Sequence, residues 1–121
     1  MSGISSVREL QEKQILGTGS VHKSAEVGAE TVTLWDPTTG SKFVVTDMIV
    51  SVSSAATVTI FDGTDTTANR LAKASLAANG GFIHNFKIPF RSSTVDNLLK
   101  VTSTAATCYI TVIGYEDNYN V

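Results

Sequence analysis

The residues with the most reactive side chains are few in this chain of 121 residues. There is one cysteine, Cys108, and there are two histidines, His22 and His84. A single thiol cannot form an internal disulfide or the multi-cysteine sites that hold zinc or iron–sulfur clusters. Two histidines provide too few ligands for most catalytic metal centres. We therefore expect no metal site and no other cofactor.

The sequence around each of these residues favours a structural role. His84 lies in Phe82-Ile-His-Asn-Phe86, and alternate residues of a strand share a face, which predicts a packed or interface histidine. Cys108 lies within a strand pattern and is expected to be buried as a small apolar residue. His22 lies in a polar stretch and is expected to be exposed.

Two other groups of residues could bind a ligand. Asp62 and Asp65 offer two carboxylates to calcium, but the spacing of an EF-hand loop is absent, so a turn with solvated aspartates is favoured. A sugar-binding surface, with an indole ring as the stacking platform, would be formed by Trp35, Asp36, Asn79 and Asn85. We favour instead a Trp35 that ends a strand and packs under the turn at 36–40.

Patterns typical of catalysis are missing from the sequence. There is no Gly-x-Ser-x-Gly nucleophile elbow, and Gly17-Thr-Gly19 is too short for a phosphate-binding fingerprint. The 11 acidic residues are spread mainly over predicted loops and termini, whereas glycosidases pair two carboxylates across a cleft. We predict that the chain is not an enzyme and has no catalytic residues.

Strand patterns cover most of the chain from residue 31 onward. Apolar and polar residues alternate with the period of a strand, and this predicts strands over 31–35, 42–53, 57–61, 70–76, 82–90, 98–103 and 109–115. A short helix within 68–78 is the local alternative, 42–61 is interpreted as a hairpin or meander, and Pro89 marks an edge strand or a strand end. The spacing of strands and turns predicts an all-β antiparallel sandwich, most simply a jelly roll.

The first twenty residues have a different pattern. Ser6 and Glu9 form a capping box, and Val7, Leu10 and Gln14 share one helical face. An isolated helix of this length is marginal in water, so it needs a surface to lie on. The alternatives are an arm docked on a partner and a frayed terminus, and we divide the chain into an N-terminal arm at 1–20 and a sandwich at 21–121.

The strands predicted at 42–53 and 109–115 are apolar on both faces. A lone sandwich would leave one apolar face of each strand exposed to water. In 42–53, Val44, Met48, Val50 and Val52 form one face and Phe43, Val45 and Ile49 the other. The arm, a second copy or a larger assembly could supply the covering layer. We predict a homo-oligomer, with a trimer preferred and a monomer as the alternative. The predicted interface residues are Val7, Leu10, Ile15, Leu16, Phe43, Val45, Ile49, Tyr109, Ile113 and Tyr115.

The charge and hydropathy of the chain exclude two classes of partner. A net charge of -2 and a pI near 5.5 do not fit a strongly basic nucleic-acid binder. No apolar run approaches the ~20 residues of a membrane span. We therefore expect neither a nucleic acid nor a membrane as partner.

Several segments resemble small virion proteins of tailed bacteriophages. They are Thr-Val-Thr-Leu-Trp at 31–35, Lys-Phe-Val-Val-Thr-Asp at 42–47, Gly-Gly-Phe-Ile-His-Asn-Phe at 80–86, Pro-Phe-Arg-Ser-Ser at 89–93, and Leu-Lys-Val-Thr-Ser with Tyr-Ile-Thr-Val-Ile-Gly-Tyr-Glu within 99–116. The resemblance carries no site residues over.

The resemblance implies a β-sandwich structural protein of the virion. The leading role is head decoration of the cement type, in which a trimer on the capsid surface clamps neighbouring major capsid protein subunits. Such a protein is made in the host cytoplasm and is located on the capsid surface of the virion. The alternative is a carbohydrate- or receptor-binding module of a phage tail or fibre.

Overall fold

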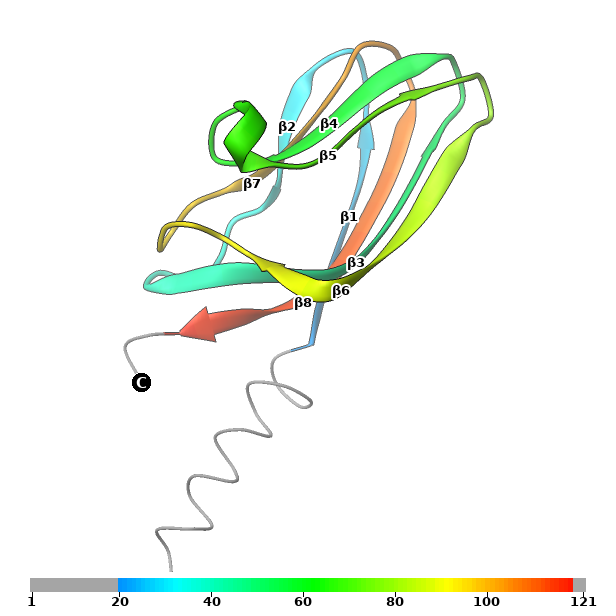
Figure 1. Ribbon diagram of the computed structural model, residues 1–121. Coiled ribbons are helices and arrows are strands. Elements are labelled where there is room, and N and C mark those ends of the chain that lie inside the picture. Colours follow the sequence, from blue (N-terminus) through cyan, green and yellow to red (C-terminus); the bar gives the residue numbers. More distant parts are fainter. Residues whose placement is uncertain (1–19, 119–121) are drawn as a thin grey trace, which may run out of the picture.

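The computed structural model describes residues 20–118, which form two antiparallel β-sheets packed face to face (Figure 1). The strands are β1 (Val21–Val27), β2 (Thr31–Trp35), β3 (Ser41–Val52), β4 (Ala56–Asp62), β5 (Arg70–Leu76), β6 (Gly81–Arg91), β7 (Leu99–Ser103) and β8 (Cys108–Asn118). A 3-10 turn, η1 (Thr67–Asn69), precedes β5. Sheet A has the order β1-β8-β3-β6 and sheet B the order β2-β7-β4-β5. The predicted all-β antiparallel sandwich is confirmed.

The strand pairs form one long antiparallel ribbon. β1 pairs with β8, β2 with β7, β3 with β6 and β4 with β5, so β4 and β5 are the tip of the ribbon. The further pairs β3–β8 and β4–β7 fold the ribbon onto itself. The interpretation of 42–61 as a hairpin is therefore wrong, because β3 and β4 lie in different sheets. A short Ser-Ala connection between two strands fits a corner between sheets as well as a hairpin.

The strand predictions fail mainly at the N-terminal end of the sandwich. β1 was not predicted from the sequence. Its less exposed positions include Lys23 and the small Ala25, so large apolar and polar residues do not alternate along it. The Ala-rich stretch around 70–76 is a strand and not the alternative helix, since it pairs with β4 along its whole length. Pro89 lies in β6, which is an edge strand as predicted. The predicted arm lies outside the described residues, apart from Ser20.

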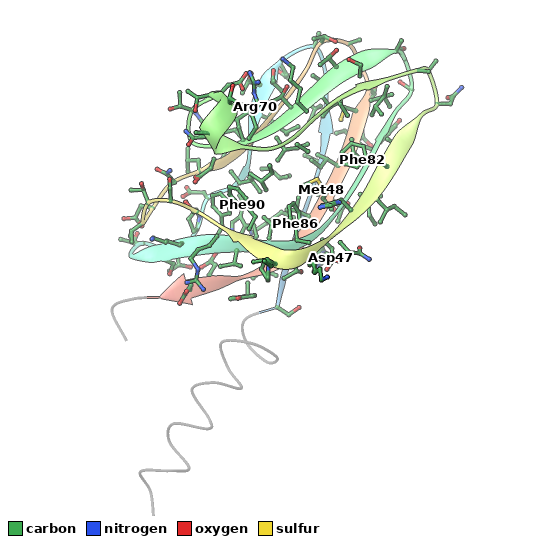
Figure 2. The ribbon with its side chains drawn as sticks, in the orientation of Figure 1. Asp47, Met48, Arg70, Phe82, Phe86 and Phe90 are labelled. Carbon is green, nitrogen blue, oxygen red and sulfur yellow. The ribbon has the colours of Figure 1, made fainter. Side chains whose placement is uncertain are left out.

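The core lies between the sheets and is formed by the inward residues of both. Its buried members are Val27, Leu34, Trp35, Phe43, Val45, Met48, Val50, Val52, Ala56, Val58, Ile60, Leu99, Val101, Cys108, Ile110 and Val112. Three phenylalanines of β6, at positions 82, 86 and 90, pack against this core from the edge of sheet A. Figure 2 shows them between the two layers with Met48, while Asp47 lies on the side of sheet A that faces away from sheet B. Each large apolar side chain buried in this way contributes about 1.5–3 kcal/mol.

A β-bulge in β3 exchanges the faces of the strand. The register shifts between Val45 and Asp47 against both neighbouring strands. Phe43 and Val45, before the bulge, are fully buried, and Met48 takes the inward position after it. The prediction that Phe43 and Val45 lie opposite Met48 is therefore wrong, because one inserted residue reverses the alternation.

The neighbouring strand accommodates the bulge with a glycine. A Cβ atom at Gly114 of β8 would collide with the backbone carbonyl oxygen of Val44. The backbones of β3 and β8 thus approach closely at this point, and the position requires glycine.

Candidate interaction surface

The outer face of sheet B is polar and typical of a sheet in contact with water. Directly paired residues of neighbouring strands share a face, and on this face they are Thr31, Thr33, Thr57, Thr59, Phe61, Arg70, Lys73, Ser75, Lys100 and Thr102. Two of them, Thr59 and Phe61, are buried. Some hydroxyls bond to one another across strands, as between Thr31 and Thr102 at 2.9 Å. Six of these ten side chains carry hydroxyls and three are cationic, while the apolar one, Phe61, is buried.

The outer face of sheet A has the opposite character. Among residues 20–118, the exposed large apolar side chains are Ile49, Ile83, Ile88, Tyr109 and Ile113. Ile49, Ile83, Tyr109 and Ile113 lie on the outer face of this sheet, whereas Ile88 of β6 is spaced by two residues from each of the core-facing Phe86 and Phe90. Ile83 is 71% exposed and Ile49 is 46% exposed. A single exposed isoleucine is ordinary, but several on one face of one sheet form a patch.

The register of sheet A shows how this patch is arranged. Three successive rows cross the outer face from β1 through β8 and β3 to β6. The first row is His22, Ile113, Asp47 and Asn85, the central row is Ser24, Thr111, Ile49 and Ile83, and the third row is Glu26, Tyr109, Ser51 and Gly81. We call these twelve residues the sheet A face. The hydroxyls of Ser24 and Thr111 lie 2.8 Å apart, as expected for neighbours in one row.

Ile49 is the centre of the apolar part of this face. Ile83 lies directly beside it, and Ile113 and Tyr109 lie diagonally on β8. Diagonal neighbours are about 7–8 Å apart, within reach of long and aromatic side chains. We call these four residues the apolar patch. Polar residues flank it on β1 (His22, Ser24 and Glu26) and on β3 (Asp47 and Ser51).

Two hollows adjoin the apolar patch. One, of about 370 Å³, is lined by Ser24, Ala25, Glu26, Tyr109, Ile110 and Thr111, and therefore lies over β1 and β8. The other, of about 310 Å³, lies at the edge between β5 and β6 and is lined by Leu71, Ala72, Ala74, Phe82, Ile83 and His84. In the second hollow the His84 ring contacts Phe86 edge-on, with 4.5 Å between the ring centroids.

The structure brings together only part of the predicted interface. Ile49, Tyr109 and Ile113 lie on the sheet A face, and Tyr115 lies one residue pair beyond it on β8 and is partly exposed. Phe43 and Val45 are in the core, as described above. Val7, Leu10, Ile15 and Leu16 lie outside the described residues.

Ile83 is a member of the apolar patch that the sequence interpretation missed. The sequence analysis assigned a role only to Phe82, His84 and Phe86, which share one face of this strand, and assigned none to Ile83 on the opposite face. The strand period predicts this position, because Ile83 and Asn85 alternate with those residues and must lie on the opposite face. If one face of the strand packs on the core, the other faces outward.

Asp62 is a buried carboxylate that fixes a loop. It is 1% exposed and accepts hydrogen bonds from Ser92 Oγ at 2.9 Å, from Ser93 N at 2.8 Å and from Asn97 Nδ2 at 2.9 Å. These donors tie the loop at 92–97 to the end of β4. The prediction of a solvated Asp62 is therefore wrong, because the loop that covers it is distant in sequence.

Asp65 does not share a site with Asp62. It is exposed and forms an ion pair with Arg70, with 2.8 Å between Nε and Oδ1. Within residues 20–118, no group of three or more histidine, cysteine, aspartate or glutamate side chains is arranged to hold a metal ion. The described part of the chain also contains no helix long and apolar enough to cross a membrane.

Trp35 is a core residue and offers no sugar-stacking platform. It is 1% exposed, and its indole Nε1 donates to Glu116 Oε2 at 2.9 Å, while Thr38 N donates to Oε1 at 3.1 Å. Burial is the largest single influence on Glu116 and raises its pKa, but the hydrogen bonds from Trp35 and Thr38, with the charge of Lys23, outweigh it. The pKa of Glu116 consequently lies below its usual 4.5.

The remaining candidates for chemistry are also accounted for by their surroundings. Cys108 is fully buried, and burial raises the pKa of its thiol, which makes it a poor nucleophile. His22 is exposed on β1, as predicted. Asp36, Asn79 and Asn85 lie, respectively, after β2, between β5 and β6, and within β6.

Comparison with known proteins gives no family assignment. No family model and no curated protein matches the chain. Among solved structures, the chain is similar to the virus-like particle of the extra small virus of the giant freshwater prawn, Macrobrachium rosenbergii. The identity is 12% and the TM-score 0.31, over 86% of this chain and 82% of that chain.

Proposed function

We propose that this chain is a structural protein of a tailed-phage particle that decorates the head and stabilises the capsid as a homo-oligomer. The observation that carries the proposal is the apolar patch around Ile49 on sheet A. Proteins that act alone rarely expose such a patch, and contiguous apolar surface commonly marks a site of protein–protein contact. The polar outer face of sheet B suits the side of the molecule that faces water.

The fold supports a virion role within this proposal. We infer that the sandwich is wound as a jelly roll, since its eight strands form a single folded ribbon with complementary pairs. Jelly rolls occur in viral capsid proteins among other classes. The resemblance of segments within 31–116 to small phage virion proteins points in the same direction.

In this proposal, two parts of the chain make different contacts. The sheet A face joins copies of the chain, and the N-terminal segment, with Val7, Leu10, Ile15 and Leu16, reaches the major capsid protein. Contact with two neighbouring capsid subunits at once would clamp them, because the area buried on each subunit opposes their separation. This role needs complementary surfaces and no reactive group.

Binding to capsids tests the proposal. Purified protein is mixed with mature empty shells of the phage that carries its gene, and bound protein and the temperature of shell rupture are measured. We expect binding and a higher rupture temperature, and we expect the full-length double variant Leu10→Asp/Leu16→Asp to bind less. Absence of binding at micromolar concentration would contradict the proposal. Localisation by electron microscopy to a tail or fibre would favour a receptor-binding module instead.

A further inference from the structure

We propose that two copies of this chain associate through their sheet A faces about a two-fold axis. The axis runs across the strands along the central row of Ser24, Thr111, Ile49 and Ile83. The inference rests on the proposed function, in which this face joins copies. It replaces the expected trimer with a dimer as the unit of association.

The three rows are arranged so that the face is complementary to itself. A two-fold rotation about the central row places each strand antiparallel over its own counterpart. A residue of the first row then faces the third-row residue of the same strand in the second copy. On β8, Ile113 faces Tyr109 of the second copy, and in the central row Ile49 and Ile83 face their own counterparts. The apolar patch is thereby covered by itself.

The polar residues of the face are complementary under the same rotation. On β1, His22 faces Glu26 of the second copy, and the symmetry makes this contact twice. On β3, Asp47 faces the hydroxyl of Ser51, which can donate to a carboxylate. The acidic groups of the three rows are Glu26 and Asp47, and they do not face each other; the His22 ring that faces Glu26 carries an N–H that can donate to its carboxylate. A shift by one row would place Glu26 against a neutral residue and remove this match.

The shape of the face also suits a dimer. The hollow beside Tyr109 is open on the outer face and offers space for Ile113 of the second copy. The three rows span five residues of each strand, roughly 17 Å, so four strands about 4.8 Å apart cover about 330 Å² on each copy, or about 650 Å² for the pair. The association reaches the ~1,000 Å² of specific interfaces when flanking residues of the same face, such as Tyr115, are buried as well. Two aligned sheets pack about 10 Å apart, a distance at which side chains of facing rows interdigitate.

A two-fold pair explains the patch more directly than a ring of three. In a three-fold arrangement the contact is heterologous, so the apolar patch would have to meet a different surface of similar chemistry. The outer face of sheet B is hydroxyl-rich and offers none. The hollow between β5 and β6 is lined in part by Ile83 of the patch itself.

Sedimentation equilibrium of the full-length chain at micromolar concentration tests the inference. We expect a dimer. Ile49→Asp places two carboxylates opposite each other at the axis and should abolish the dimer, with an unchanged circular dichroism spectrum. Thr33→Asp, at an exposed position of sheet B, is the matched control and should remain a dimer. A wild-type monomer or trimer would overturn the inference.

A charge exchange on β1 tests the predicted pairing itself. His22→Glu places two pairs of carboxylates opposite each other and should weaken the dimer about tenfold. Adding Glu26→Lys restores opposite charges and should return the affinity to near the wild-type value. Failure of this rescue would contradict the proposed axis. A monomer that binds and protects shells would overturn the dimer and keep the decoration role, whereas a dimer that binds no shells would do the reverse.

Discussion

Removal of the Asp62 carboxylate should destabilise the sandwich far more than removal of an exposed carboxylate nearby. In Asp62→Ala, the donors Ser93 N, Ser93 Oγ and Asn97 Nδ2 lose their acceptor, and the backbone amide of Ser93 cannot rotate to find another. The hydroxyl of Ser92 can donate instead to the Thr94 carbonyl, 3.0 Å away. Each buried donor left without a partner costs about 1–3 kcal/mol. We therefore expect a loss of about 2–5 kcal/mol, a large part of the ~5–15 kcal/mol that stabilises a typical domain.

Urea unfolding followed by the fluorescence of Trp35, the one tryptophan of the chain, measures this loss. Asp65→Ala is the matched control, because its ion pair with Arg70 is exposed and such pairs contribute about 0–1 kcal/mol. Asp62→Asn should fall between the two, since an amide keeps an oxygen for Ser93 N but loses the charge. The slope of the unfolding curve should not change among the variants. Equal stabilities of Asp62→Ala and Asp65→Ala would refute the role assigned to the buried carboxylate.

Three further predictions concern the core of the sandwich and its rim. Gly114→Ala should lower the free energy of unfolding by at least about 3 kcal/mol or prevent folding, because its Cβ meets the Val44 carbonyl oxygen; near-wild-type stability in urea would contradict the close approach of the two strands. Cys108 should react slowly with a thiol reagent at pH 8 and rapidly in denaturant, because burial raises its pKa and blocks access; fast labelling of the folded protein would show that the thiol is accessible. Glu116 has a lowered pKa in the folded state, so its stabilising effect is present above its usual 4.5 and is lost as the pH falls through the lowered value. Glu116→Gln should therefore reduce stability at pH 7 more than at pH 3, and an equal loss at both pH values would exclude this origin.

The fold class could be predicted from the sequence because the alternation of apolar and polar residues is local. The strand predicted at 70–76 agrees with β5 in both bounds, and the one predicted at 31–35 agrees with β2. The same alternation failed at 42–53, where one inserted residue moves Phe43 and Val45 into the core. A bulge has no distinctive composition, so its place depends on the pairing of β3 with strands distant in sequence.

The candidate surface was predictable only in part for the same reason. Two apolar faces on neighbouring strands correctly indicated that Ile49, Tyr109 and Ile113 are exposed. Which of them are neighbours depends on register, and so does the inclusion of Ile83. The burial of Asp62 was not predictable either, because its covering loop lies thirty residues further along the chain. Patterns within a strand indicate its faces, while the partners on those faces are set by topology.

The pairing of β1 with β8 has a practical consequence for the two ends of the chain. Val21 lies opposite Gly114, so the chain enters the sandwich and leaves it at the same end of sheet A (Figure 1). The connections at 28–30, 53–55, 77–80 and 104–107 are gathered at the opposite end, where Val52 N bonds to Gly80 O and Ser53 N to Thr107 O. A peptide grafted into the turn at 77–80 would therefore project from the pole of the sandwich opposite to the one at which Val21 and Gly114 lie.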